Sequence, residues 1–126
     1  MSVLVDSSVW VDYFRGAPRS EMLDFLIEND LVLVNDLILA ELVPALHVRQ
    51  QRKLISLLRE INRIPIKIDW DALIHMQTLC IRNGINKIGV PDLVIAQNAI
   101  QNNIQLFTHD KHFALMARHI PLSLYQ

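Results

Sequence analysis

The hydrophobic positions of the chain alternate between short apolar runs and longer stripes at helical spacing. The short runs, typical of buried strands, occupy residues 2–5, 31–34, 64–68, 104–107 and 121–125. The helical stripes occupy residues 9–14, 20–29, 37–48, 49–62, 69–84 and 91–103, and a last one runs from a cap at 108–110 to 118. This alternation predicts an α/β fold with a mainly parallel sheet and helices on both faces.

Polar residues and prolines indicate where these elements begin and end. Ser7 or Ser8 is expected to cap the first helix, and Asn35 or Asp36 the helix over 37–48. Pro65 lies within the run 64–68, which favours an edge strand there because proline cannot donate to a ladder. No repeat or linker interrupts the pattern, so residues 1–126 are expected to form a single domain.

Composition and charge exclude several classes of protein. Twelve Lys and Arg against 13 Asp and Glu give a net charge of −1, so nucleic acid would have to be held by a local patch or a metal. The single Cys80 excludes an internal disulfide framework and a multi-cysteine zinc site. No apolar run reaches the roughly 18 residues of a membrane span, and no signal peptide is visible, so we expect a cytoplasmic protein with no membrane association.

Two acids follow predicted strands directly. Asp6 comes after the run 2–5, and Asp110 follows the run 104–107. Ligands of open α/β sheets bind beyond the carboxyl ends of the strands, so both acids are candidates for a site. Either one taken alone is also explained as a helix cap.

Two further acids stand in apolar sequence. Glu41 is the only charged residue between Asp36 and His47, and helical spacing puts it within the apolar stripe, where a carboxylate is costly unless it is paired, protonated or bound to a cation. The alternative is a Glu41 that reaches past the rim to water or to an Arg. Asp92 follows Pro91 in the first turn of a predicted helix, where the helix dipole also favours an acid.

The four acids together suggest a chemistry that none suggests alone. Carboxylates gathered in one place repel each other and resist ionising together, and a divalent cation removes that repulsion. An all-oxygen donor set favours Mg²⁺ or Mn²⁺, and such a site is suited to hydrolysing phosphodiester bonds.

Four segments in order resemble the motifs of the PIN-domain nucleases, in particular the VapC-type toxins of type II toxin–antitoxin systems. The segments are VLVDSSVWVDYFRG (3–16), DLILAEL (36–42), VPDLVIA (90–96) and LFTHDKHF (106–113). The resemblance implies a three-layer α/β/α fold and a Mg²⁺- or Mn²⁺-dependent endoribonuclease that cleaves RNA with a metal-activated water. Its metal-binding and catalytic acids would be Asp6, Glu41, Asp92 and Asp110.

The resemblance also assigns roles around the acids. Ser8 and Thr108 match the hydroxyl residues that would orient carboxylates or water, with helix capping as their other role. Many relatives carry another acid two places after the fourth one, where this chain has His112. Arg15, His109 and Lys111 are candidate contacts to RNA, and His112 is expected to be a residue of the rim. Asp12, six residues past Asp6 on a helix, is expected to face solvent.

The implied partners are an RNA substrate, a cognate antitoxin and a second copy of the chain in a homodimer. The homodimer would be joined through the early helices and those around residues 49–62. The high mean hydropathy of +0.25 agrees with apolar surface buried against a partner. Three other functions stay open: a housekeeping RNA-processing PIN nuclease, a PIN-like binding module with a dead site, and a phosphate-transfer switch. The last is disfavoured because Asp6 is followed by Ser7 rather than a second acid.

Overall fold

A computed structural model describes residues 1–16, 18 and 21–126. Four strands form one parallel sheet in the order β3-β2-β1-β4: β1 (Val3–Val5), β2 (Val32–Val34), β3 (Asn62–Arg63) and β4 (Gln105–Phe107). The predicted parallel sheet is therefore confirmed.

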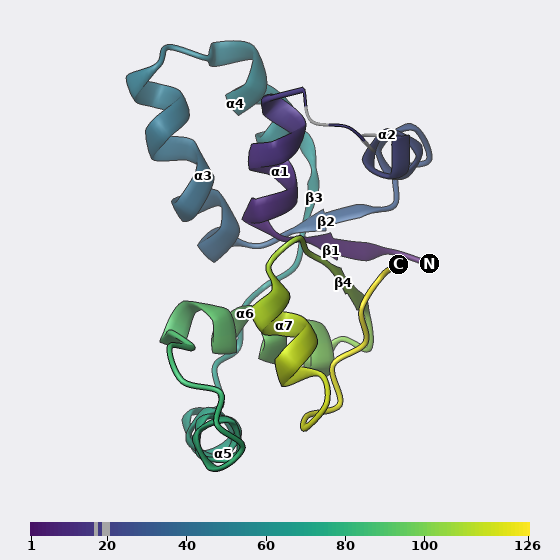
Figure 1. The fold of residues 1–126 in the computed structure, drawn as a ribbon. Coiled ribbons are helices and arrows are strands. Elements are labelled where there is room, and N and C mark those ends of the chain that lie inside the picture. The colour runs from purple at the N-terminus through teal and green to yellow at the C-terminus, as the bar shows by residue number, and fades with distance from the viewer. Residues whose placement is uncertain (17, 19–20) are drawn as a thin grey trace.

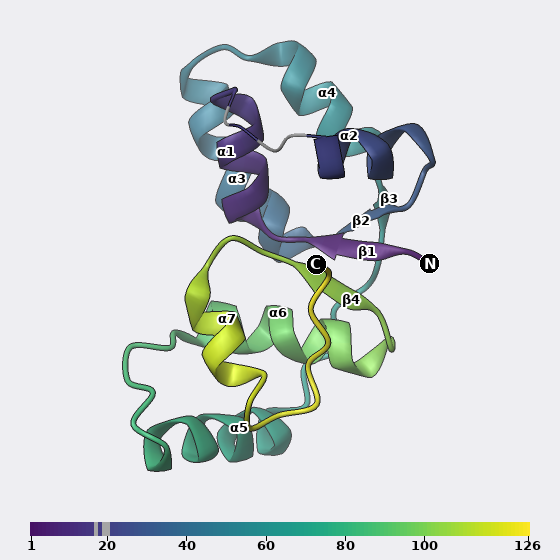
Figure 2. The ribbon, with the colours of Figure 1, turned by 45° about the vertical axis from the view of Figure 1, so that its right-hand side comes forward.

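Helices cover both faces of this sheet (Figures 1 and 2). On one side lie α1 (Ser7–Phe14), α2 (Glu21–Glu28), α3 (Asp36–Val48) and α4 (Arg52–Glu60). On the other lie α5 (Trp70–Arg82), α6 (Val90–Gln101) and α7 (Lys111–Met116). The fold is thus the predicted three-layer α/β/α arrangement.

The central strand β1 shows why the sequence forms this architecture. Val3, Leu4 and Val5 are all fully buried, because helices cover both faces of the strand and every side chain meets apolar neighbours. The register pairs Leu4 with Leu33 of β2 and with Leu106 of β4. All strands point the same way, so the residues that follow β1, β2 and β4 emerge at one edge.

Two buried side-chain amides, those of Asn35 and Asn98, link segments at that edge by hydrogen bonds. Asn35, directly after β2, accepts a hydrogen bond from the Ile38 N–H (2.9 Å) and so caps α3. Its Nδ2 donates to Asn98 Oδ1 of α6 (2.9 Å), and Asn98 Nδ2 donates to the Pro65 carbonyl (3.0 Å). Both amides are essentially fully buried. This chain of hydrogen bonds therefore joins the two helical layers at the edge where the strands end.

Two sequence predictions are wrong in their boundaries. α1 begins at Ser7 with Asp6 as its N-cap residue, not at Val9 with a serine cap. The third strand is Asn62–Arg63 and not 64–68, because α4 already ends at Glu60 and the pairing with β2 stops after Ile64 N–H bonds the Val34 carbonyl. Pro65, without an N–H, cannot extend that ladder.

The remaining differences are small. The run 121–125 makes only an isolated bridge, between Leu124 and Leu106. The segment predicted as a helix over 49–62 starts at Arg52, because Gln50 at φ 56° forms a turn after α3. Ser20, the predicted start of α2, lies outside the described residues. Within the described parts of the chain, no helix is long and apolar enough to cross a membrane.

Candidate metal and nuclease site

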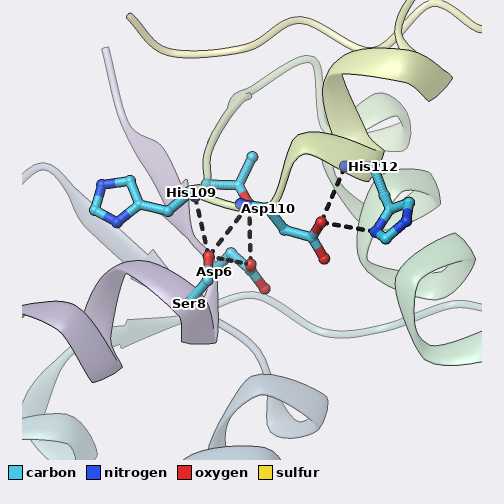
Figure 3. Close-up of polar contacts among 6 residues, drawn as sticks. Asp6, Ser8, His109, Asp110 and His112 are labelled. Carbon is cyan, nitrogen blue, oxygen red and sulfur yellow. Dashed lines mark hydrogen bonds and ion pairs between the residues drawn. The ribbon is translucent and has the colours of Figure 1, made fainter.

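Asp6 is the most firmly held acid of the site. Its side chain is only 4% exposed, and two hydroxyls contact the same oxygen: Ser8 Oγ lies 2.7 Å and Thr108 Oγ1 3.0 Å from Asp6 Oδ2 (Figure 3). Each hydroxyl also accepts a backbone N–H, from His109 to Ser8 (3.0 Å) and from Asp110 to Thr108 (3.0 Å). Both hydroxyls are thus placed to donate to the same oxygen of Asp6.

This network joins two strand ends that are far apart in sequence. β1 and β4 are neighbours, and the Asp6 N–H bonds the Phe107 carbonyl (2.9 Å). The hydroxyls of Ser8 and Thr108 continue the connection beyond the last ladder bond, 3.3 Å from each other. The position of Asp6 is therefore fixed by β1, α1 and the loop after β4 together.

Asp110 begins α7 as its N-cap residue. Its Oδ1 accepts the backbone N–H of His112 (2.9 Å) and lies 2.9 Å from His112 Nδ1 (Figure 3). The cap explains why an acid stands at this position locally. The His112 side chain is about one-third exposed, so its ring contacts both Asp110 and solvent.

Asp92 is the third residue of α6, whose N-cap is Gly89. Burial raises its pKa most, and the charges of Asp110 and Asp6 raise it further. His112 and the backbone N–H of Gly89 lower the same pKa. The electrostatic influence of Asp110 and Asp6 indicates that α6 brings Asp92 into the space beside both.

Glu41 lies on α3 and joins the same group. Burial, then the charges of Asp6 and Asp92, raise its pKa, whereas a hydrogen bond from Ser7 lowers it. The expectation that Glu41 lies within the buried stripe is wrong, because the buried face of α3 runs through Ile38, Leu42 and Leu46 and leaves the Glu41 side chain exposed. Neighbouring protein atoms still remove enough water from it to disfavour its charge.

The four predicted acids therefore form one electrostatic neighbourhood at the carboxyl edge of the sheet. Among the described residues, no three His, Cys, Asp or Glu side chains are arranged as a ready metal cage. The donors nevertheless fit a hard divalent cation, because all four are carboxylates, and burial together with the charges of neighbouring acids raises the pKa of Glu41 and of Asp92. A cation at this edge would relieve that repulsion.

The candidate RNA contacts are placed unequally. His109 and Lys111 are exposed and line a cavity of about 160 Å³ together with Thr108, Asp110 and Tyr125. Arg15 lies at the other end of α1, about 12 Å from Ser7 at 1.5 Å of rise per residue. The structure therefore brings His109 and Lys111 to the acids, but not Arg15.

One contact at the rim escaped the sequence analysis. Asp12 is partly exposed to solvent, as expected, but its Oδ2 also lies 2.6 Å from His109 Nδ1. Helical geometry gives the direction of Asp12 on α1 but not the course of the loop after β4. No sequence spacing links residues 12 and 109, so no local signal could have predicted the pair.

The sequence pattern of the PIN domain family matches residues 3–119. The chain belongs to the PIN domain family. No match was found among curated proteins. The four acids thus lie at the carboxyl edge of the sheet of a PIN domain.

Several solved structures share this fold. VapBC2 from Rickettsia felis, bound to a DNA fragment from its promoter, is 24% identical with a TM-score of 0.77, over 99% of this chain and 98% of that one. VapBC-1 from nontypeable Haemophilus influenzae is 21% identical with a TM-score of 0.71, over 100% and 98%. VapC20 from Mycobacterium tuberculosis, a toxin that cleaves the sarcin–ricin loop, is 15% identical with a TM-score of 0.65, over 97% and 99%. These similarities show a common fold over the whole PIN domain.

Proposed function

We propose that this protein is a Mg²⁺- or Mn²⁺-dependent endoribonuclease that acts in the cytoplasm as the toxin of a toxin–antitoxin pair. The observation that supports this most is the group of four carboxylates in a PIN domain, where burial and then the charges of Asp6 and Asp92 raise the pKa of Glu41. Burial and neighbouring negative charges both disfavour ionisation of these acids, which is explained if their partner is a cation.

Asp6, Glu41, Asp92 and Asp110 would hold the metal. When bound, it would lower the pKa of a water molecule and polarise a phosphoryl oxygen. Ser8 and Thr108 keep one oxygen of Asp6 occupied, which orients the carboxylate. His109 and Lys111, exposed beside Asp110, are placed to contact RNA phosphates.

RNA cleavage by the purified protein tests the activity. We expect cleavage of total RNA with Mg²⁺ or Mn²⁺ that is lost with EDTA and in Asp6→Asn. Glu60→Gln, which removes an exposed acid on α4 away from the four acids, should cleave like wild type. Cleavage that survives EDTA or Asp6→Asn would contradict the proposal, and a folded wild type that cleaves no cellular RNA would favour a binding module with a dead site.

A cognate antitoxin is the second part of the proposal. Two of the similar structures are VapBC complexes, and an antitoxin that covers the acids would explain how a cell tolerates such a nuclease. We expect a small protein encoded beside this chain to co-purify with it and to inhibit cleavage. Cleavage that is unaffected by the neighbouring protein would favour a housekeeping role in RNA processing.

For the proposed homodimer, the exposed apolar side chains favour a surface around α5 rather than the predicted interface of the early helices and residues 49–62. Ile68, Trp70, Ile74, Ile81 and Val90 are all at least 39% exposed, and most of them border an apolar groove of about 350 Å³. Such a concentration of exposed large apolar side chains is typical of a protein interface.

Asp71 and Arg82 lie 11 residues apart on α5, about 20° apart around the helix. Antiparallel packing of α5 on its copy would pair each Asp71 with the partner's Arg82, so the face is complementary to itself.

Light scattering of the protein purified alone tests the dimer. We expect wild type to be dimeric and Ile74→Asp to be monomeric, whereas Val48→Asp, at a still more exposed apolar residue on α3, should stay dimeric. Asp71→Arg should weaken the dimer and the double variant Asp71→Arg/Arg82→Asp should restore it. A wild-type monomer, or a dimer unaffected by Ile74→Asp, would contradict this surface.

A further inference from the structure

The inference concerns His112, which lies two residues after Asp110 in the first turn of α7. The imidazole carries no negative charge, so it cannot replace a carboxylate in holding a cation by charge. Its contacts suggest a different role. Two groups of His112 reach the same atom, since the backbone N and the ring Nδ1 both lie 2.9 Å from Asp110 Oδ1.

These two contacts have different effects on the Asp110 carboxylate. The backbone N–H caps α7, a role that needs no particular side chain at position 112. The ring adds a second donor to the same oxygen and fixes the rotation of the carboxylate. Figure 3 shows the other oxygen, Oδ2, turned away from His112. Oδ2 is therefore the oxygen left to bind a ligand.

A residue that served only to cap α7 would need only the backbone contact, so the ring contact calls for a separate explanation.

We propose that His112 is a positioning residue of the metal site, which holds Asp110 through Nδ1–H so that Oδ2 faces the ion. This inference rests on the proposed metal-dependent function. Hydrogen-bond donors to metal-binding carboxylates orient the ligand, and their removal usually lowers metal affinity by about 10- to 100-fold. The proposal requires only a proton on Nδ1, which the neutral and the charged imidazole both can carry.

Mn²⁺ titration calorimetry on three proteins tests this: wild type, His112→Ala and His112→Asn. His112→Ala keeps the backbone N–H and hence the cap of α7, but removes the ring donor. His112→Asn places an amide Nδ2 close to the position of the lost Nδ1. We expect the Mn²⁺ dissociation constant to rise about 10-fold in His112→Ala and to return most of the way in His112→Asn. Melting temperatures without metal should agree between the two variants, because both keep the same cap.

Pulsed electron paramagnetic resonance of bound Mn²⁺ adds a spectroscopic readout. We expect no directly coordinated nitrogen in the wild type, because Nδ1 faces Asp110. Unchanged Mn²⁺ affinity in His112→Ala would overturn the positioning role, and a directly coordinated nitrogen would overturn it in favour of His112 as a ligand. A wild-type protein that binds no Mn²⁺ at all would overturn the proposed function as well, which separates the two failures.

Discussion

Thr108 offers the sharpest perturbation of the site, because one hydroxyl serves two acids. It donates to Asp6 Oδ2 (3.0 Å) and accepts the Asp110 N–H (3.0 Å). Thr108→Val keeps the shape of the side chain and removes both hydrogen bonds. Asp6 then keeps only the donor from Ser8, and the Asp110 N–H, at the start of α7, loses its partner in a partly buried position.

The expected loss of stability follows from these two bonds. A hydrogen bond to a charged group contributes about 1.5–3 kcal/mol, and a polar group left without its partner in a buried position costs about 1–3 kcal/mol. Both hydrogen bonds are only partly buried, so water replaces part of each, and we expect Thr108→Val to lower the free energy of unfolding by about 2 kcal/mol. With a urea slope of about 2 kcal/mol per molar, the unfolding midpoint should fall by about 1 M.

Urea unfolding of the metal-free protein measures this loss, and Mn²⁺ titration measures its effect on the site. Thr108→Ser, which keeps the hydroxyl and loses only a methyl group, is the matched control and should retain most of the stability. Mn²⁺ affinity should fall about 10-fold or more in Thr108→Val, because Asp6 loses an orienting donor. If Thr108→Val unfolds at the same urea concentration and binds Mn²⁺ like Thr108→Ser, the reasoning about this network is refuted.

Further predictions concern the acids and the buried amides. Glu41 and Asp92 have pKa values raised by folding, so the folded protein binds their protons more tightly than the unfolded chain does, and stability falls as pH rises from about 4 through the raised values. Without metal at pH 7, Glu41→Gln and Asp92→Asn should therefore melt at a higher temperature than wild type. Added Mn²⁺ should raise their melting temperatures less than it raises that of wild type. Lower melting temperatures without metal would contradict the crowding of the acids. Asn98→Leu should lower the free energy of unfolding by about 1–3 kcal/mol in urea because it strands the Asn35 amide and the Pro65 carbonyl, and an unchanged midpoint would show that these bonds contribute nothing net.

Much of the fold could be predicted because its cause is local. Buried parallel strands must be continuously apolar, which made Val3–Val5 and Val32–Val34 visible in the sequence. Asp6 and Asp110 could be placed at one edge because parallel strands end on the same side. The third strand could not be placed, because its two residues are exposed and polar, and pairing with β2 alone makes them a strand.

The details of the site depended on contacts between distant segments. Spacing along α3 put Glu41 in the apolar stripe, but the position of α3 on the sheet, with the cap at Asn35, turns it outward towards Asp6 and Asp92. Nothing in the sequence links Asp12 to His109 or Asn35 to Asn98, because each pair is joined only when the loops and helices pack. The His112 ring was expected at the rim. Its contact with Asp110 is local, two residues apart, but it depends on side-chain rotamers that the sequence does not specify.

The central claim is that the four acids at the carboxyl edge of the sheet together bind one cation. Diffraction locates such an ion directly. Crystals grown with Mn²⁺ and measured above and below the manganese absorption edge would show where manganese binds. We predict an anomalous peak in contact with carboxylates from among Asp6, Glu41, Asp92 and Asp110, and its absence in crystals of Asp6→Asn. A well-ordered wild-type crystal with no peak at these acids, or with manganese only elsewhere on the surface, would contradict the account.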